Sequence, residues 1–260
     1  MDDENVKYDS LKDSVSTPEK DSSPISQHSA DEPSQLGAVF KPVQSGKTFE
    51  VIEAIKQRFN TETDTLRGFH MIFTMDTTLC SSQFTGRVLN DICGYQYGYP
   101  PNYGEESVQH GTKIWMPTGN SYYNHEIAII TCNPGKIPKY IKEHPKVKTY
   151  KKISDIYARF VEANIDEAHN RARVQIVIMC TNVKRINTIE PILNMVGYGD
   201  AFEKVFMYFD ELHKYINMGK KPENNPIREI IKKIQTNENY DNLVENIMGI
   251  TASPVAMLNC

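Results

Sequence analysis

Residues 41–48, with the sequence KPVQSGKT, have the composition and the setting of a phosphate-binding loop. They follow an apolar segment expected to be a strand, residues 36–40, and precede a segment of helical period, residues 49–58. Backbone N–H groups at the start of such a helix face a bound phosphate, and the helix dipole favours negative charge there. The local context therefore predicts a site for a phosphorylated ligand.

Three side chains of this loop have the types that nucleotide chemistry needs. Gly46 would let the backbone come close to the ligand, and Lys47 would reach the β- and γ-phosphates. The Thr48 hydroxyl would hold Mg²⁺. The pattern departs from G-x-x-x-x-G-K-[ST] at one position, because Lys41 replaces the first glycine.

An acidic pair at the end of a buried strand would complete a Mg²⁺ site, and the sequence offers two candidates of the form D-E-x-H. Asp210 directly follows the apolar strand expected at residues 205–209, so we predict that Asp210 ligates Mg²⁺ and that Glu211 is the general base for the attacking water. Asp166 instead follows a segment of helical period and precedes a strand. We interpret residues 166–169 as a surface helix end.

Residues 249–254, GITASP, end the last apolar strand about forty residues after the acidic pair. Hydroxyl side chains at a strand end beside a γ-phosphate can sense its loss, which makes Thr251 and Ser253 candidate coupling residues. The alternative is a simple strand-to-turn exit that Pro254 terminates. The order of the three motifs favours the coupling function.

Near-continuous apolar strands alternate with helical segments after residue 36, which is typical of a parallel sheet buried on both faces. Strands are expected at residues 36–40, 69–75, 126–132, 173–181, 205–209 and 247–251. Helices are expected at residues 49–58, 82–92, 138–144, 153–168, 188–195 and 226–235. Residues 94–125, rich in Tyr, Gly and Pro, are expected to be an irregular insertion with a small hairpin.

The first 35 residues differ in composition from the remainder. They hold nine acidic residues and three lysines, with eight serines and three prolines. Such a segment cannot bury enough apolar surface to offset its ordering entropy, so we predict a disordered acidic tail at residues 1–35 and one domain at 36–260. No apolar run is long enough to cross a membrane. Five widely spread cysteines without a C-x-x-C pair indicate a reducing, intracellular compartment, the cytoplasm or the nucleus.

The order QSGKT, then DELH, then TAS resembles the first RecA-like motor lobe of superfamily 2 helicases, a DExH-type group of P-loop NTPases. The family's motif I matches Gln44, Ser45, Gly46, Lys47 and Thr48, motif II matches the segment from Asp210 to His213, and motif III matches the segment from Thr251 to Ser253. The resemblance covers residues 36–254. It implies a three-layer α/β lobe with a mainly parallel sheet.

The resemblance also implies an ATP-binding and ATP-hydrolysing motor, with Mg²⁺, that acts on DNA or RNA. We expect the nucleic acid to lie across the carboxyl ends of the strands, touching the loops near Thr77, Asn133 and Asn182. His213 would couple the nucleotide state to the Thr251 and Ser253 motif. The family uses two such lobes, and the second supplies an arginine finger. The sequence ends at Cys260, so we expect the second lobe to come in trans or from a longer parent chain.

Two groups of residues outside these motifs could also contact nucleic acid. Seven lysines between positions 136 and 152, among them Lys136, Lys139 and Lys142, could grip phosphates, although a solvated surface is the alternative. Tyr95, Tyr97, Tyr99 and Tyr103 could stack bases, although a structured insertion explains them equally.

Two other functions remain open for the chain as a whole. One is a terminase-like DNA-packaging ATPase, which combines similar motifs. The other is a non-catalytic module that binds a nucleotide or a partner protein. Turnover assays would separate the last of these from an enzyme.

Overall fold

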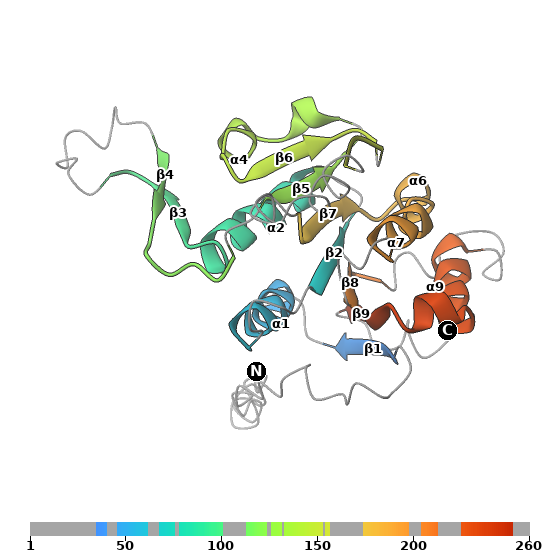
Figure 1. Ribbon diagram of the computed structural model, residues 1–260. Helices are drawn as coiled ribbons and strands as arrows, with labels where there is room; N and C mark the ends of the chain where they lie inside the picture. Colours follow the sequence, from blue (N-terminus) through green and yellow to red (C-terminus); the bar gives the residue numbers. More distant parts are fainter. Residues whose placement is uncertain are drawn as a thin grey trace, which may run out of the picture.

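The computed structural model describes residues 35–40, 46–61, 68–75, 78–100, 113–123, 126–131, 133–152, 154–156, 174–197, 204–212 and 225–251. Seven parallel strands form one sheet, in the order β1-β9-β8-β2-β7-β5-β6 (Figure 1). These strands are β1 (Gln35–Phe40), β2 (Gly68–Thr74), β5 (Ile127–Ile130), β6 (Val147–Tyr150), β7 (Ile176–Cys180), β8 (Lys204–Asp210) and β9 (Val244–Thr251).

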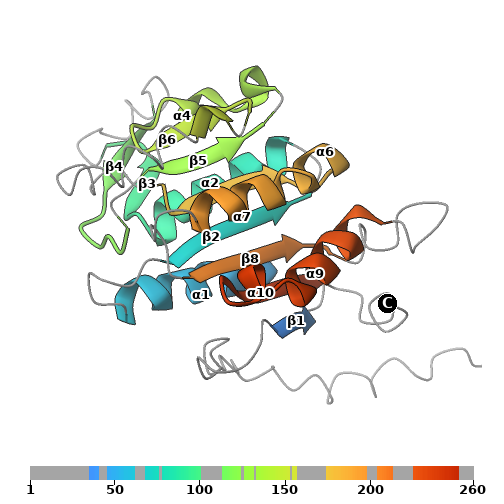
Figure 2. The same cartoon turned by 45° about the vertical axis from the view of Figure 1, so that its right-hand side comes forward.

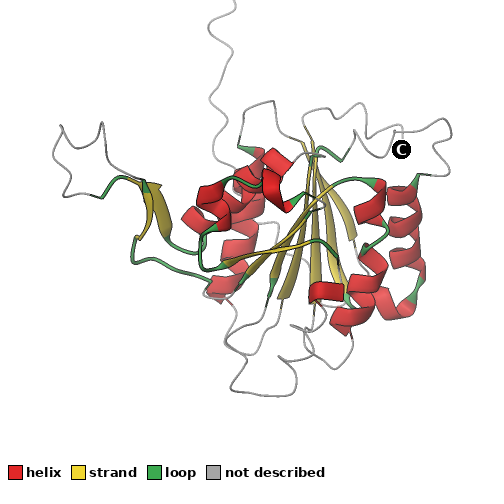
Figure 3. Ribbon diagram, turned by 90° about the horizontal axis from the view of Figure 1, so that it is seen from above, coloured by secondary structure: helices red, strands yellow, loops and turns green. Residues whose placement is uncertain are grey.

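Helices cover both faces of this sheet (Figure 3). The helices are α1 (Lys47–Thr61), α2 (Thr78–Asp91), α4 (Lys139–Lys142), α6 (Val183–Ile186), α7 (Ile189–Gly197), α9 (Pro226–Thr236) and α10 (Glu238–Asp241), with the 3₁₀ turn η1 (Pro134–Lys136). The central strands β2, β5 and β7 are buried along their whole length, as expected of apolar strands covered on both sides.

The path of the chain explains which helices cover which face. The outward leg runs from β1 through β2 and β5 to β6, and the return leg inserts β7, β8 and β9 between those strands. Crossovers between parallel strands are right-handed, so legs that run in opposite directions place their helices on opposite faces. Accordingly, α1, α2 and α4 share one apolar core, and α6, α7, α9 and α10 share the other (Figure 2).

The return leg also decides which strand ends are neighbours. Strand β9 lies between β1 and β8, so the strand before the predicted phosphate loop and the strand before the acidic pair are each hydrogen-bonded to β9. All seven strands are parallel, and their carboxyl ends therefore lie at one edge of the sheet. This edge is where open α/β sheets bind ligands.

Two further strands form an antiparallel hairpin that projects from the body of the molecule (Figures 1 and 3). They are β3 (Tyr95–Gly98) and β4 (Ile114–Pro117), within the segment predicted as an insertion. The hairpin joins the end of α2 to the start of β5, so it lies at the amino edge of the sheet, opposite the carboxyl edge.

The fold confirms the predicted three-layer α/β class with a parallel sheet and is consistent with a RecA-like lobe. Strand β6 was not predicted, since no strand was expected at residues 147–150. Residues 1–34, most of the predicted helix 153–168 and the second acidic string 166–169 lie outside the described residues. Across the described part of the chain, no helix has the length and apolar character that a bilayer crossing requires.

Candidate functional site at the carboxyl edge of the sheet

The start of α1 is built by Gly46. Its φ of 83° lies in the left-handed region that glycine adopts most easily. The Gly46 carbonyl accepts hydrogen bonds from the backbone N–H groups of Phe49, at 2.8 Å, and Glu50, at 3.3 Å. The helix therefore begins at Lys47, two residues earlier than its apolar period predicts, and its first turn carries Lys47 and Thr48.

The end of β8 places the acidic pair at the same edge. Asp210 is the last residue of β8, and its Cα lies opposite that of Ile250 in β9. Glu211 follows with φ 55°, the one positive φ among the described non-glycine residues. Its backbone N–H donates to the Ile250 carbonyl at 2.7 Å. This bond holds the turn against β9 and fixes the direction in which the Glu211 side chain leaves the backbone.

An ion pair joins these two motifs. The Lys47 ammonium group donates to Glu211 Oε1, and each side chain is only 13% exposed. The two residues are 164 positions apart in the sequence. Partly buried charges are costly unless they are paired, so each of these groups compensates the charge of the other. The structure thus brings together Lys47 and Glu211, which the sequence analysis assigned to one site.

Strand β9 supplies the third motif. Thr251 is fully buried, and its Cα lies opposite that of Phe40, the last residue of β1. Thr251 therefore lies beside the point where the chain enters the predicted phosphate loop. Gly249 lies behind the acidic turn, and a Cβ added to it would come within 2.4 Å of Leu212 Cδ2. Only glycine lets Leu212 pack this closely on β9.

The donor groups at this edge fit a nucleotide phosphate and a magnesium ion. Mg²⁺ prefers oxygen ligands and is typically held by one or two carboxylates together with substrate phosphates. Thr48 offers a hydroxyl and Asp210 a carboxylate, and both side chains are partly exposed. Their chain neighbours Lys47 and Glu211 are in direct contact, so the backbone carries both oxygen donors to the same part of the edge.

A second polar group at this edge, which the sequence analysis missed, joins the ends of β2 and β7. The Thr74 hydroxyl contacts Ser81 Oγ at 2.8 Å, and Ser81 Oγ contacts Cys180 Sγ at 3.3 Å. The Thr181 hydroxyl donates to the Thr74 carbonyl at 2.7 Å. All four side chains are buried, which makes this part of the edge a rigid support. Small hydroxyl residues at two strand ends are the signal that could have predicted it.

The loops expected to contact nucleic acid lie at the same edge where they are described. Asn133 follows β5 and is exposed. Asn182 follows β7, and its side chain accepts from the Arg185 backbone N–H at the start of α6. The buried Arg185 guanidinium donates to the Lys151 carbonyl through Nη1 and Nη2, at 3.3 Å each, which fixes the chain after β6. Nothing in the sequence marks Arg185 for this function.

The remaining predicted residues fall into two groups. Gln44, Ser45, His213, Ser253 and the predicted contact loop at Thr77 lie outside the described residues. Lys136, Lys139 and Lys142 are exposed beside β6, at the other end of the strand order from β1. These three lysines are therefore not part of the site that Lys47 and Glu211 form.

No protein-family model matches the sequence, and no curated protein matches it in a sequence search. Among solved structures, the chain is similar to a nuclease-deletion mutant of the Type ISP restriction-modification enzyme LlaGI in complex with a DNA substrate mimic, with a TM-score of 0.46 and 12% identity. The aligned region covers 86% of this chain and 16% of that chain. A likeness at this level assigns neither a family nor a function.

Proposed function

We propose that this chain is the ATP-binding and ATP-hydrolysing motor lobe of a superfamily 2 type helicase or related nucleic-acid-dependent ATPase. The contact between Lys47 at the start of α1 and Glu211 after β8 carries the proposal. A cation at a helix N-terminus beside a carboxylate pair at a strand end is an arrangement that P-loop NTPases use for phosphoryl transfer.

The two charged residues have separate functions in this proposal. Lys47 binds the β- and γ-phosphates and neutralises charge that develops during transfer. Glu211 accepts the proton of the attacking water. Because the two side chains are paired in the structure, an arriving triphosphate takes Lys47 as its own partner and leaves the Glu211 carboxylate available to water.

Thr48 and Asp210 would hold the magnesium ion, which neutralises phosphate charge when bound. The loop that contains Gln44 and Ser45 would supply backbone N–H donors to the phosphates. Thr251 lies beside the end of β1, and in this proposal it responds to the γ-phosphate. His213 and Ser253 would extend this coupling.

The partner in this proposal is DNA or RNA, bound at the carboxyl edge of the sheet. Asn133 and Asn182 follow two strands that end at this edge. A second RecA-like lobe, in trans or in a longer parent chain, would close over the nucleotide and supply an arginine finger. Such a residue is worth roughly 10³–10⁵ in rate, so we expect slow hydrolysis by this lobe alone.

Thermal unfolding with and without Mg²⁺-ATP tests the proposal. A ligand at 100 times its Kd stabilises by about 2.7 kcal/mol, which raises the Tm of a domain of this size by roughly 5–10 °C. We expect this shift in the wild type and in Lys56→Ala, a control in the same helix, and not in Lys47→Ala. Comparing shifts removes the effect of each substitution on the ligand-free Tm. The absence of a shift in the wild type, or an equal shift in Lys47→Ala, would refute the proposed phosphate site.

A further inference from the structure

A strongly basic surface lies along the β6 side of the molecule. Residues 133–152 contain seven lysines and one glutamate, whereas the protein as a whole has a net charge of −4. Six of these lysines are exposed and are here called the basic edge: Lys136, Lys139, Lys142, Lys148, Lys151 and Lys152. Two acidic side chains of the described residues contact this segment. Glu143 pairs with Lys139 at 3.6 Å, and Asp155 accepts from the Lys152 backbone N–H at 3.1 Å.

The order of the elements distributes these lysines between the two edges of the sheet. Lys136 ends η1, which follows the carboxyl end of β5, and Lys139 and Lys142 follow on α4 as the chain returns to the amino edge. Lys148 lies on β6, the last strand in the sheet order. The basic edge therefore connects the carboxyl edge of the sheet with the amino edge, where the hairpin projects.

Aromatic rings attach the hairpin to the basic edge. The ring of Tyr97 stacks on that of Tyr140, which lies between Lys139 and Lys142 on α4, with centroids 4.7 Å apart. The Trp115 ring lies 5.2 Å from that of Tyr97, and Trp115 Nε1 donates to the Tyr140 carbonyl at 2.5 Å. His144 closes the cluster, with its ring 5.3 Å from that of Trp115. The hairpin is thus fixed on α4.

One of these rings remains accessible. Tyr97 is 37% exposed, whereas Tyr140 and Trp115 are more buried. Grooves that bind single strands combine a basic track for the phosphates with aromatic side chains against which bases stack. Here the exposed tyrosine is packed on the helix that carries Lys139 and Lys142, so an aromatic ring and two of the lysines are held in one unit.

We propose that the basic edge and Tyr97 form a second binding surface for single-stranded nucleic acid, separate from the site that Lys47 and Glu211 form. The lysines contact phosphates, and a base packs against the exposed part of Tyr97. An acidic peptide would pair with the lysines, but its carboxylates would not pack against the Tyr97 ring. We therefore favour nucleic acid. The proposal does not depend on the proposed ATPase function, because neither Lys47 nor Glu211 belongs to this surface.

Trp115 is the only tryptophan of the chain, so its fluorescence reports on this surface directly. The experiment titrates the full chain, without nucleotide, with a dT20 oligonucleotide, the duplex of the same length and polyglutamate. We expect dT20 to change the Trp115 emission, with an affinity that falls as salt rises. Binding elsewhere on the molecule would leave this emission unchanged.

Matched variants separate the two parts of the surface. Lys142→Ala removes one phosphate contact, which should weaken dT20 binding about fivefold at 0.1 M salt and lower the salt slope by about 0.7. Lys232→Ala, at another exposed lysine, on α9, should leave the affinity and the salt slope unchanged. Tyr97→Leu should weaken binding about fivefold or more, and Tyr97→Phe should retain it. An unchanged emission maximum of the free variants shows that the hairpin is still packed on α4.

Three results would overturn the proposal. They are the absence of any Trp115 response to dT20, equal binding of polyglutamate or duplex, and indifference to both Lys142→Ala and Tyr97→Leu. Each of these leaves the proposed nucleotide site untouched, since that site is tested by Mg²⁺-ATP and Lys47→Ala.

Discussion

At the scale of single residues, the backbone of Glu211 is unusual. A non-glycine residue at φ 55° is disfavoured by roughly 1–2 kcal/mol, and such conformations persist where the surroundings hold them. Here the Ile250 carbonyl holds the Glu211 N–H and Lys47 holds the carboxylate. The strained turn directs this carboxylate at the start of α1, which agrees with the proposed general base.

The substitution Glu211→Gln tests that assignment. The amide keeps the size of the side chain and can accept a hydrogen bond from Lys47, but it cannot take a proton from water. We therefore expect ATP binding to be retained and turnover to fall by about 10²–10⁴-fold. Single-turnover hydrolysis with radiolabelled ATP measures this loss, and Glu53→Gln on the exposed side of α1 is the control. Hydrolysis by Glu211→Gln at the wild-type rate would show that another group is the base.

The sequence predicted which residues meet at this site better than how they meet. An apolar strand before GKT and another before DELH require both motifs to lie at the carboxyl edge, so the pattern alone predicts that Lys47 and Glu211 share this edge. The left-handed turn at Glu211 does not, because glutamate has no preference for that conformation. The pairing depends on the place of β9 between β1 and β8, which no local pattern encodes.

At the scale of elements, the turn after β8 depends on its packing against β9. Leu212 is fully buried, and its side chain occupies the space that a Cβ at position 249 would need. We expect Gly249→Ala to destabilise the fold by about 1–3 kcal/mol, because the new Cβ displaces Leu212. Leu212→Ala alone should cost about 2–5 kcal/mol through the cavity it leaves. The free energies of unfolding in urea measure both.

The double variant Gly249→Ala/Leu212→Ala tests directly whether these two residues compete for space. The smaller side chain in Leu212→Ala makes room for the Cβ at position 249, so the two substitutions together should cost less than their sum by about 0.5–3 kcal/mol. Strict additivity would mean that the two residues do not compete for the same space.

Strand β6 shows where element prediction from sequence fails. Its four residues, VKTY, alternate poorly and lie among lysines, so the hydrophobic signal is weak. Edge strands commonly carry lysines, which discourage pairing with other chains. The strands that were predicted, such as β7 with the sequence IVIMC, are buried on both faces and contain a continuous apolar run. Burial on two faces gives a sequence signal that a half-covered edge does not.

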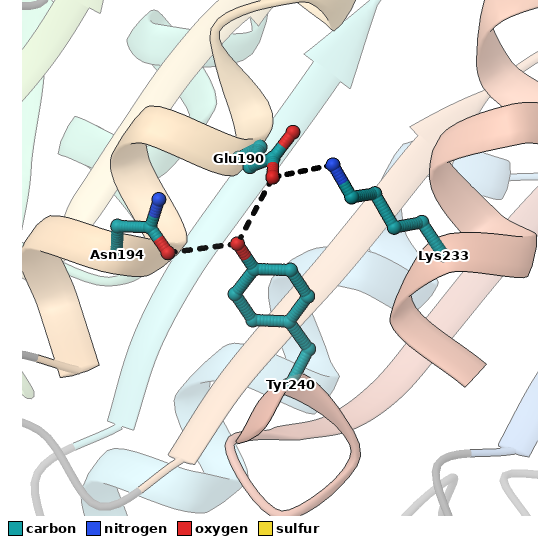
Figure 4. Close-up of polar contacts among 4 residues, drawn as sticks. All are labelled: Glu190, Asn194, Lys233 and Tyr240. Atoms are coloured by element: carbon teal, nitrogen blue, oxygen red, sulfur yellow. Dashed lines mark hydrogen bonds and ion pairs between the residues drawn. The ribbon is translucent and has the colours of Figure 1, made fainter. Parts of the chain in front are cut away.

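A polar network joins three helices on the face opposite α1 (Figure 4). The Tyr240 hydroxyl on α10 donates to Asn194 Oδ1 at 2.7 Å and lies 3.3 Å from Glu190 Oε1, and both acceptors are on α7. Lys233 on α9 donates to Glu190 Oε1 at 2.5 Å. The hydrogen bond from Lys233 holds the pKa of Glu190 below its usual value. Any stability from this charge is therefore present at neutral pH and is lost as the pH falls through the lowered pKa.

The substitution Tyr240→Phe tests whether this network links the helices. It removes the hydroxyl and keeps the buried ring, so we expect a loss of about 0.5–1.5 kcal/mol in the free energy of unfolding. Tyr122→Phe, at an exposed tyrosine, should change stability little. Equal effects of the two substitutions would show that the network does not contribute.

At the scale of the whole molecule, β2 lies in the middle of the sheet and carries a buried histidine. His70 is fully buried, with its ring 5.2 Å from those of Phe59 on α1 and Phe206 on β8. Its Nδ1 lies 3.4 Å from the Tyr208 hydroxyl, and Nε2 has no partner among the described residues. Burial, together with the positive charge of Arg58, lowers the pKa of His70 from 6.5 to about 3. The folded lobe therefore holds this imidazole neutral.

This histidine should make the whole lobe sensitive to acid. The unfolded chain takes up a proton near pH 6.5 and the folded chain only near pH 3, so the stability from neutral His70 is complete above pH 6.5 and is lost progressively below it. Between pH 7.5 and pH 5 this group alone should remove about 2 kcal/mol from the free energy of unfolding. His70→Phe keeps an aromatic ring in the stack and does not titrate, so urea unfolding at several pH values should show a smaller loss in the variant. Between pH 7.5 and pH 5, the free energy of unfolding of the wild type should fall by about 2 kcal/mol more than that of His70→Phe. An equal fall in the two proteins would mean that His70 is already protonated or accessible to water in the folded lobe.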